Sequence, residues 1–159
     1  MMHVSRVLLS LVVLGLSLAC LGGPEVKPEW VESGVDAPTE QVLWNAALQA
    51  LSKHDYPLGA VLDRSGGQMV SGWKTSLAAF RSQGWREKAW IQFQRQDKGR
   101  YAVQVRVQRE TNEDIIRPLD PSHAKWEPAP DDTRAARILM QTIRSYLGPE
   151  LEIEGESGS

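Results

Sequence analysis

Large apolar side chains alternate with small or polar ones along residues 101–108, and this is the clearest pattern in the chain. A period of two residues predicts a strand with one buried face and one solvated face. Residues 88–95 alternate in the same way, and Asp97-Lys98-Gly99 between the two runs has the composition of a tight turn, with Gly99 suited to left-handed backbone. The two runs therefore predict an antiparallel hairpin over residues 88–108.

A helical period marks two other segments, residues 39–53 and 133–147. In each, apolar side chains recur every three or four positions and form a stripe along one side. The start and stop signals are Thr39 and Pro57 for the first, and Asp131 or Asp132 and Gly148-Pro149 for the second. Both segments are predicted to be amphipathic helices that must bury their stripes.

Two shorter strands are predicted over residues 58–63 and 68–74, joined by a turn at Ser65-Gly66-Gly67. Together these elements predict an α+β domain at residues 39–149, in the order α-β-β-β-β-α. We expect a mainly antiparallel four-stranded sheet packed on one face by the two helices. The long loop over residues 112–131 is expected to pack across the sheet through Ile115, Ile116, Leu119 and Trp126.

Within the first twenty residues, a basic residue, Arg6, precedes a short apolar run over residues 7–19 that ends in small side chains. Such a run is too short to cross a hydrocarbon core of about 30 Å and is typical of a secretory signal peptide. We therefore expect residues 1–19 to be a leader. No later stretch approaches the length of a transmembrane helix, so the mature chain is not expected to span a membrane.

The end of this leader resembles a bacterial lipobox, in which cleavage leaves a lipidated cysteine as the first residue. The segment is Leu16-Ser17-Leu18-Ala19-Cys20, in which Ala19 fits the family pattern and Ser17 departs from it. The resemblance implies acyl chains on Cys20 that hold the protein to a bilayer. A secreted protein without lipid and an uncleaved membrane anchor are the alternatives. Leu21 is not the Asp that retains such proteins in the inner membrane, which favours the periplasmic face of the outer membrane.

Proline and glycine are frequent in residues 20–38, and the end of the chain, residues 150–159, is acidic and rich in glycine and serine. The first segment is expected to be a flexible tether between the lipid and the domain, and the second a disordered tail. A single cysteine excludes a disulfide within the chain. With 18 basic and 20 acidic residues, the net charge of −2 gives no general attraction to nucleic acid.

No enzyme signature, metal-ligand spacing or cofactor motif was found, so we expect a non-catalytic protein without a cofactor or metal. His54 is interpreted as a cation at a helix C-terminus. His123 beside Asp120 could form a base with its orienting carboxylate, and an ordinary loop surface is the favoured interpretation. Ser65-Gly66-Gly67 is interpreted as a turn because no phosphate-binding motif accompanies it.

The polar positions of the predicted hairpin are the candidate binding site. They face away from Ile91 and Phe93 and include Trp90, Gln92, Gln94, Gln104 and Arg106. Residues 81–109 hold eight basic and two acidic side chains, an excess of +6, so an acidic protein partner is one hypothesis. A small ligand or cell-wall glycan bound through Trp90 or Trp126 is a second, and a solvated face without a ligand is a third.

Residues 41–74 are similar to the repeat of the outer-membrane assembly lipoprotein BamC. The likeness consists of a helix ending near Tyr56, a strand with Asp63, the turn at Gly66-Gly67 and a strand ending in Trp73. It implies an accessory role without catalysis and transfers no functional residue. The sequence therefore predicts a lipid-anchored envelope protein that docks a protein partner.

Overall fold

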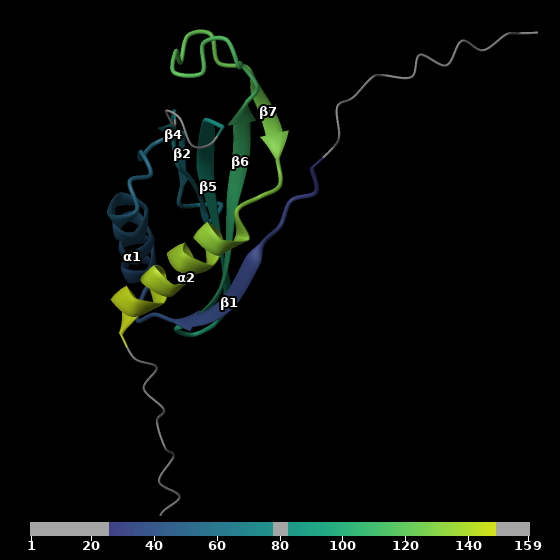
Figure 1. Cartoon of the computed structure of the whole chain (residues 1–159). Helices are drawn as coiled ribbons and strands as arrows, with labels where there is room; N and C mark the ends of the chain where they lie inside the picture. Colours follow the sequence, from purple (N-terminus) through teal and green to yellow (C-terminus); the bar gives the residue numbers. More distant parts are fainter. Residues whose placement is uncertain (1–25, 78–82, 149–159) are drawn as a thin grey trace, which may run out of the picture.

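The computed structural model describes residues 26–77 and 83–148, and the predicted leader, Cys20 and the tail at 150–159 lie outside them (Figure 1). Within the described residues the chain forms seven strands and two helices. In chain order they are β1 (Val31–Asp36), α1 (Glu40–Lys53), β2 (Val61–Asp63), β3 (Gln68–Val70), β4 (Lys74–Ser76), β5 (Trp85–Asp97), β6 (Arg100–Asn112), β7 (Trp126–Ala129) and α2 (Thr133–Leu147). The predicted α+β class is confirmed, and the predicted sheet of four strands is corrected to seven in the described part of the chain.

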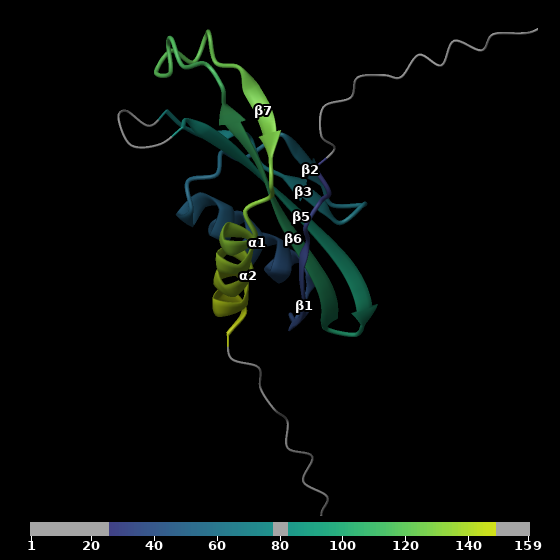
Figure 2. The same cartoon turned by 45° about the vertical axis from the view of Figure 1, so that its right-hand side comes forward.

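The long hairpin of β5 and β6 is the centre of a fully antiparallel sheet with the order β1-β6-β5-β3-β2. Near the far end of the hairpin, β4 pairs with β5 and β7 pairs with β6. Both helices lie on the same face of the sheet and contact each other (Figure 2). We call the opposite face, which carries Trp90 and Gln92, the outer face.

The core lies between the helices and the inner positions of the hairpin. Leu43 and Leu51 of α1 and Leu139 and Ile143 of α2 are fully buried against the valines of β6, including Val105. Thr39 caps α1 and Asp132 caps α2, each accepting a hydrogen bond from a main-chain N–H in the first turn. No helix among the described residues is long and apolar enough to span a membrane.

The strand β1 lies inside the segment that the sequence predicted to be a tether. Val35 is buried and Val31 is half-buried, while the alternate residues Glu32, Gly34 and Asp36 are exposed. The strand pairs with β6, with Val31 opposite Val105, so the main-chain groups of β1 have hydrogen-bond partners in β6. The prolines on either side of the strand had suggested an irregular segment. The prediction of a tether over residues 20–38 is therefore wrong for residues 31–36.

The predicted loop over residues 112–131 is also shorter in the structure, because β7 takes residues 126–129. Pro128 within β7 lacks a main-chain N–H, and the strand tolerates it because β7 pairs only with β6 in the described residues. The expectation that the loop packs across the sheet is wrong for Ile115 and Ile116, which are 89% and 85% exposed, and for Leu119, which is half exposed. Trp126 is partly buried as expected.

The two short predicted strands exist with different limits. β2 begins at Val61, later than predicted, and the run predicted over residues 68–74 divides into β3 and β4. The turn between β2 and β3 is confirmed: Gly67 has a φ of +61°, and a Cβ at this position would lie 2.5 Å from the carbonyl oxygen of Phe93. Gly99 also has left-handed backbone, as expected for the turn of the long hairpin.

Candidate functional site

The register of β5 and β6 brings all five predicted binding residues together on the outer face. Trp90 pairs with Arg106 and Gln92 with Gln104, while Gln94 lies opposite Ala102. Ile91, between Trp90 and Gln92, points to the helices and is fully buried. The predicted orientation of the two strands is therefore confirmed, and a role of these residues in binding stays a prediction.

A shallow hollow of about 330 Å³ lies on the outer face near the β5–β6 turn. It is lined by Gly66, Gln68, Gln92, Phe93, Gln94, Ala102 and Gln104. Gln68 joins the predicted glutamines because β3 pairs with β5 in the register Gln68 with Gln92. Four amide side chains thus line one depression, and each offers both hydrogen-bond donors and an acceptor without net charge.

Sequence reasoning missed Gln68 as a site residue. Residue 68 stood at the start of a predicted strand, but the sequence held no signal for which strand would be its neighbour. Ala102 is the other unexpected contributor to this hollow. Its small side chain lies among larger ones on the outer face, so it leaves space at the floor of the depression.

Beyond Trp90, the outer face carries a stack of aromatic rings and cations. The Arg86 guanidinium lies 4.3 Å from the ring centre of Trp73 and 4.8 Å from that of Trp126, and the Lys88 ammonium lies 4.3 Å from Trp73. Contacts of this kind stabilise by about 0.5–1 kcal/mol at exposed sites. Trp126, one of the two predicted ligand-binding tryptophans, is therefore already engaged with Arg86.

Two arginines of the outer face, Arg106 and Arg86, are paired with carboxylates of the chain. Arg106 donates to Asp131 through Nε at 2.6 Å and through Nη2 at 3.2 Å, and the Asp131 side chain is 1% exposed. Arg86 donates to Glu110 at 2.6 Å. Part of the local positive charge is therefore paired within the chain, while Lys88 contacts the ring of Trp73.

Asp131 has a second role, because it also accepts a hydrogen bond from the main-chain N–H of Glu29 at 2.9 Å. Its carboxylate lies where β1 and β7 leave a gap along the edge of β6, since their pairings end at Val105 and resume at Arg109. One buried carboxylate thus joins the N-terminal segment, the sheet and the start of α2.

On the inner face, a polar network lies between α1, α2 and the hairpin. The Tyr56 hydroxyl donates to Glu87 at 3.2 Å, and Arg109 contacts both Glu87 at 3.4 Å and Asp132 at 3.1 Å. Burial, followed by the nearby charge of Asp132, raises the pKa of the Glu87 carboxyl, and Arg109 opposes this shift. Burial and the neighbouring Glu87 likewise raise the pKa of Tyr56.

This network has the features of a structural element. Every buried side-chain nitrogen and oxygen in the described residues has a hydrogen-bond partner, so none is left free to bind a ligand. His54 is similar: its Nε2 lies 2.9 Å from Thr142 Oγ1, linking the end of α1 to α2. Burial, together with Lys53 and Lys74, lowers the pKa of His54. The lowered value favours the neutral ring and argues against the predicted role as a cation.

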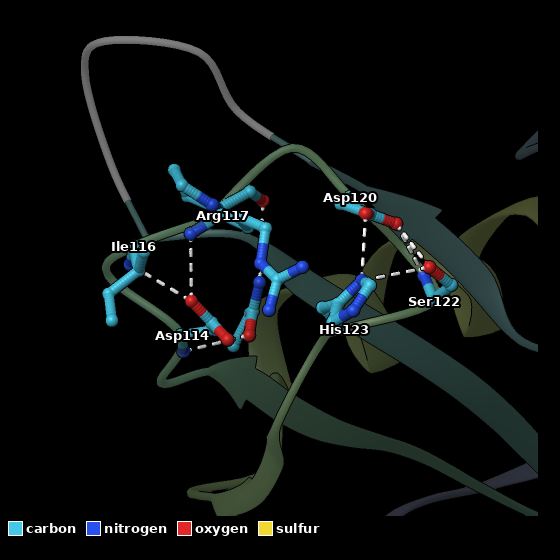
Figure 3. Close-up of polar contacts among 8 residues, drawn as sticks. Asp114, Ile116, Arg117, Asp120, Ser122 and His123 are labelled. Atoms are coloured by element: carbon cyan, nitrogen blue, oxygen red, sulfur yellow. Dashed lines mark hydrogen bonds and ion pairs between the residues drawn. The ribbon is translucent and has the colours of Figure 1, made fainter.

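Asp120, Ser122 and His123 form a hydrogen-bonded cluster on the loop between β6 and β7 (Figure 3). Both the Asp120 carboxylate, at 2.8 Å, and the Ser122 hydroxyl, at 3.0 Å, contact the same ring nitrogen, Nδ1. A catalytic triad needs the carboxylate and the nucleophile on opposite ring nitrogens. The predicted pairing of His123 with Asp120 is therefore present, but its geometry is that of a loop turn and not of a proton relay.

No group of three or more metal-ligating side chains occurs in residues 26–77 and 83–148. Comparison with known proteins adds little. No protein-family model matches the chain, and no curated protein matches it. Among solved structures, a TBP-like protein from Parabacteroides distasonis is similar at 15% identity with a TM-score of 0.38, over 62% of this chain and 64% of that chain. A likeness of this size carries no argument about fold or function.

Proposed function

We propose that this protein is a non-catalytic, lipid-anchored protein of the bacterial envelope that docks a protein partner through its outer face. The leader and Cys20 support the anchor, with the periplasmic face of the outer membrane as its location. One observation carries the docking surface: the five candidate residues lie on adjacent central strands, and three of them, Gln92, Gln94 and Gln104, line a hollow. The BamC-like segment at residues 41–74 agrees with an accessory role.

The pairing of both outer-face arginines changes the kind of partner that we expect. Arg106 and Arg86 already hold Asp131 and Glu110, so an acidic partner would have to displace internal carboxylates. Amide side chains instead favour neutral hydrogen bonding, as to the main chain of an extended segment of the partner. Binding should therefore depend weakly on ionic strength, because none of the residues that line the hollow is charged.

The test places a photo-crosslinking residue at position 94, on the exposed rim of the hollow, in the full chain expressed in a bacterial envelope. We expect one defined protein adduct, which the double variant Gln92→Ala/Gln104→Ala abolishes. The matched control Gln49→Ala/Gln141→Ala removes two exposed glutamines from the helices and should leave the adduct intact. An adduct that survives the outer-face variant, or is lost in both variants, would contradict docking at the hollow.

A cell-wall glycan or another small polyhydroxylated ligand is the second candidate. The neutral amide lining and the volume of the hollow favour it, since hydroxyl groups pair with both ends of an amide. Purified peptidoglycan fragments titrated against the same two double variants separate the candidates. Fragment binding that Gln92→Ala/Gln104→Ala abolishes, without a protein adduct at position 94, would replace the first proposal by the second.

The anchor is tested independently of the ligand. Mass spectrometry of the mature N-terminus should find a chain that begins at Cys20 and carries diacylglycerol on the sulfur. A chain that begins elsewhere, or one with an unmodified Cys20, would overturn the anchor while leaving the outer face open to the tests above.

A further inference from the structure

The loop between β6 and β7 displays three large apolar side chains within five residues. Ile115 and Ile116 are adjacent and nearly fully exposed, and Leu119 is half exposed. Single exposed apolar residues are common on proteins, whereas a cluster at the tip of a projecting loop marks a contact surface. In both views the loop extends beyond the end of the sheet (Figures 1 and 2).

The hydrogen bonds of the loop hold these side chains outward. Asp114 Oδ1 accepts from the main-chain N–H groups of Ile116 at 2.9 Å and Arg117 at 2.8 Å. At the base, Asn112 Oδ1 accepts from Asp114 and Lys125, both at 3.0 Å, so it closes the loop. Figure 3 shows Ile116 pointing away from the cluster of Asp120 and His123. The polar groups of the loop are thus satisfied internally, while its apolar side chains have no such contacts.

The loop lies at the end of the domain toward which the N-terminal segment leads. β1 runs antiparallel to β6, with Asp36 opposite Arg100 and Val31 opposite Val105. The chain before Val31 therefore approaches from the end where β6 stops at Asn112. Glu29 is held by Asp131, and the nine steps of main chain from Cys20 to Glu29 span at most about 30 Å even when fully extended. An anchor on Cys20 would keep this end of the domain near the bilayer.

We propose that the tip of the loop, residues 115–119, inserts into the lipid bilayer as a second membrane contact beside the acyl chains of Cys20. The inference rests on the proposed lipid anchor. Arg117 and Lys125 on the same loop can place their aliphatic stems against the lipid and their charges among the headgroups. Two contacts fix the orientation of the domain, with the long axis of the hairpin pointing away from the membrane and the outer face open at the side.

The experiment measures the depth of the loop with a fluorescent label. Once Cys20 carries its thioether, Ile115→Cys introduces the only free thiol of the mature chain. The acylated full-length protein, labelled there with an environment-sensitive dye, is reconstituted into phosphatidylethanolamine–phosphatidylglycerol vesicles that contain doxyl-labelled lipid. Leu62→Cys on β2 is the matched control, because Leu62 is 49% exposed and lies level with Ile91 and Val105 in the middle of the hairpin.

We expect a blue shift and quenching by the doxyl lipid for the label at position 115, and neither for the label at position 62. With the label moved to Leu119→Cys, Ile115→Ser/Ile116→Ser should abolish the quenching, whereas Val61→Ser/Leu62→Ser should preserve it. Protein that floats with the vesicles while position 115 stays unquenched would overturn the inserted loop alone. Protein that does not float would overturn the anchor, and this inference with it.

Discussion

The two faces of the β5–β6 hairpin use alternate residues of the same strands but differ in how they hold polar groups. The inner face buries valines and isoleucine under two helices, together with one closed network around Glu87. The outer face presents glutamines and tryptophan, and its arginines are paired with carboxylates. The comparison shows two kinds of polar group on the outer face: arginines that are paired with carboxylates, and uncharged amides, of which Gln104 donates to Glu32 at 3.3 Å.

The largest effect is expected from a charge placed on the inner face. Val105→Asp would leave a carboxylate without a partner among Leu43, Leu139 and Ile143, which costs several kcal/mol and should prevent folding. Gln94→Asp puts the same charge on the exposed outer face and should change the free energy of unfolding by less than about 1 kcal/mol. Thermal melts followed by circular dichroism measure both, and a Val105→Asp variant that melts normally would mean that the two faces are assigned the wrong way round.

The second prediction concerns the one charge pair of the outer face that is deeply buried. Arg106→Met keeps most of the side-chain volume but leaves the buried Asp131 side chain without its main partner. Breaking such a pair destabilises by about 3 kcal/mol. In urea titrations, the double variant Arg106→Met/Asp131→Asn should recover part of this loss. A single variant as stable as the wild type would show that the outer face is simply solvated.

The third prediction uses the raised pKa of Glu87. Burial lifts its pKa above the ordinary value of 4.5, so the folded chain holds this proton at pH values where the unfolded chain has released it. The free energy of unfolding therefore falls as the pH rises from 4.5 through the raised pKa. Glu87→Gln removes this term, and the fall should be smaller in the variant. Denaturant midpoints measured across this range test it, and parallel profiles would contradict it.

The variant with the smallest expected effect on stability is the one with the largest expected effect on the proposed docking. Gln92→Ala/Gln104→Ala removes two amides from the rim of the hollow, and both side chains are only partly buried. In urea titrations, we expect each substitution to change the free energy of unfolding by no more than about 0.5 kcal/mol. The double variant should nevertheless lose the crosslink at position 94. A strongly destabilised variant would mean that the hollow serves the fold and not a ligand.

The sequence predicted an element correctly where a regular apolar pattern coincided with a buried surface of the fold. Val103, Val105 and Val107 defined the facing of β6, and the capping and stop signals at Asp132 and Gly148 placed α2 at its observed limits. The class of the fold and the shared face of the five site residues followed from these patterns. The local rules were reliable there because each choice of residue agreed with the burial that the fold imposes.

The sequence was insufficient where an element depends on its neighbour. β1 is a short edge strand that contains a glycine, and β7 contains Pro128, so both lack the usual signal and exist through pairing with β6. For the same reason the sequence did not indicate Gln68 as a residue of the hollow, because local composition does not determine the order of strands in a sheet. Nor did the sequence indicate that Arg106 pairs with Asp131. Without that pairing, the +6 excess of residues 81–109 suggested a basic surface.

The bond from Glu29 to Asp131 has a mechanical consequence. If the partner pulls on the outer face while Cys20 is held in lipid, the force enters the domain at Glu29 and then runs along β1. Because β1 lies antiparallel to β6, a pull along its axis applies shear to the hydrogen bonds between the two strands together and does not break them one after another. The resistance of such a protein to tension would be set by its rate of unfolding under force.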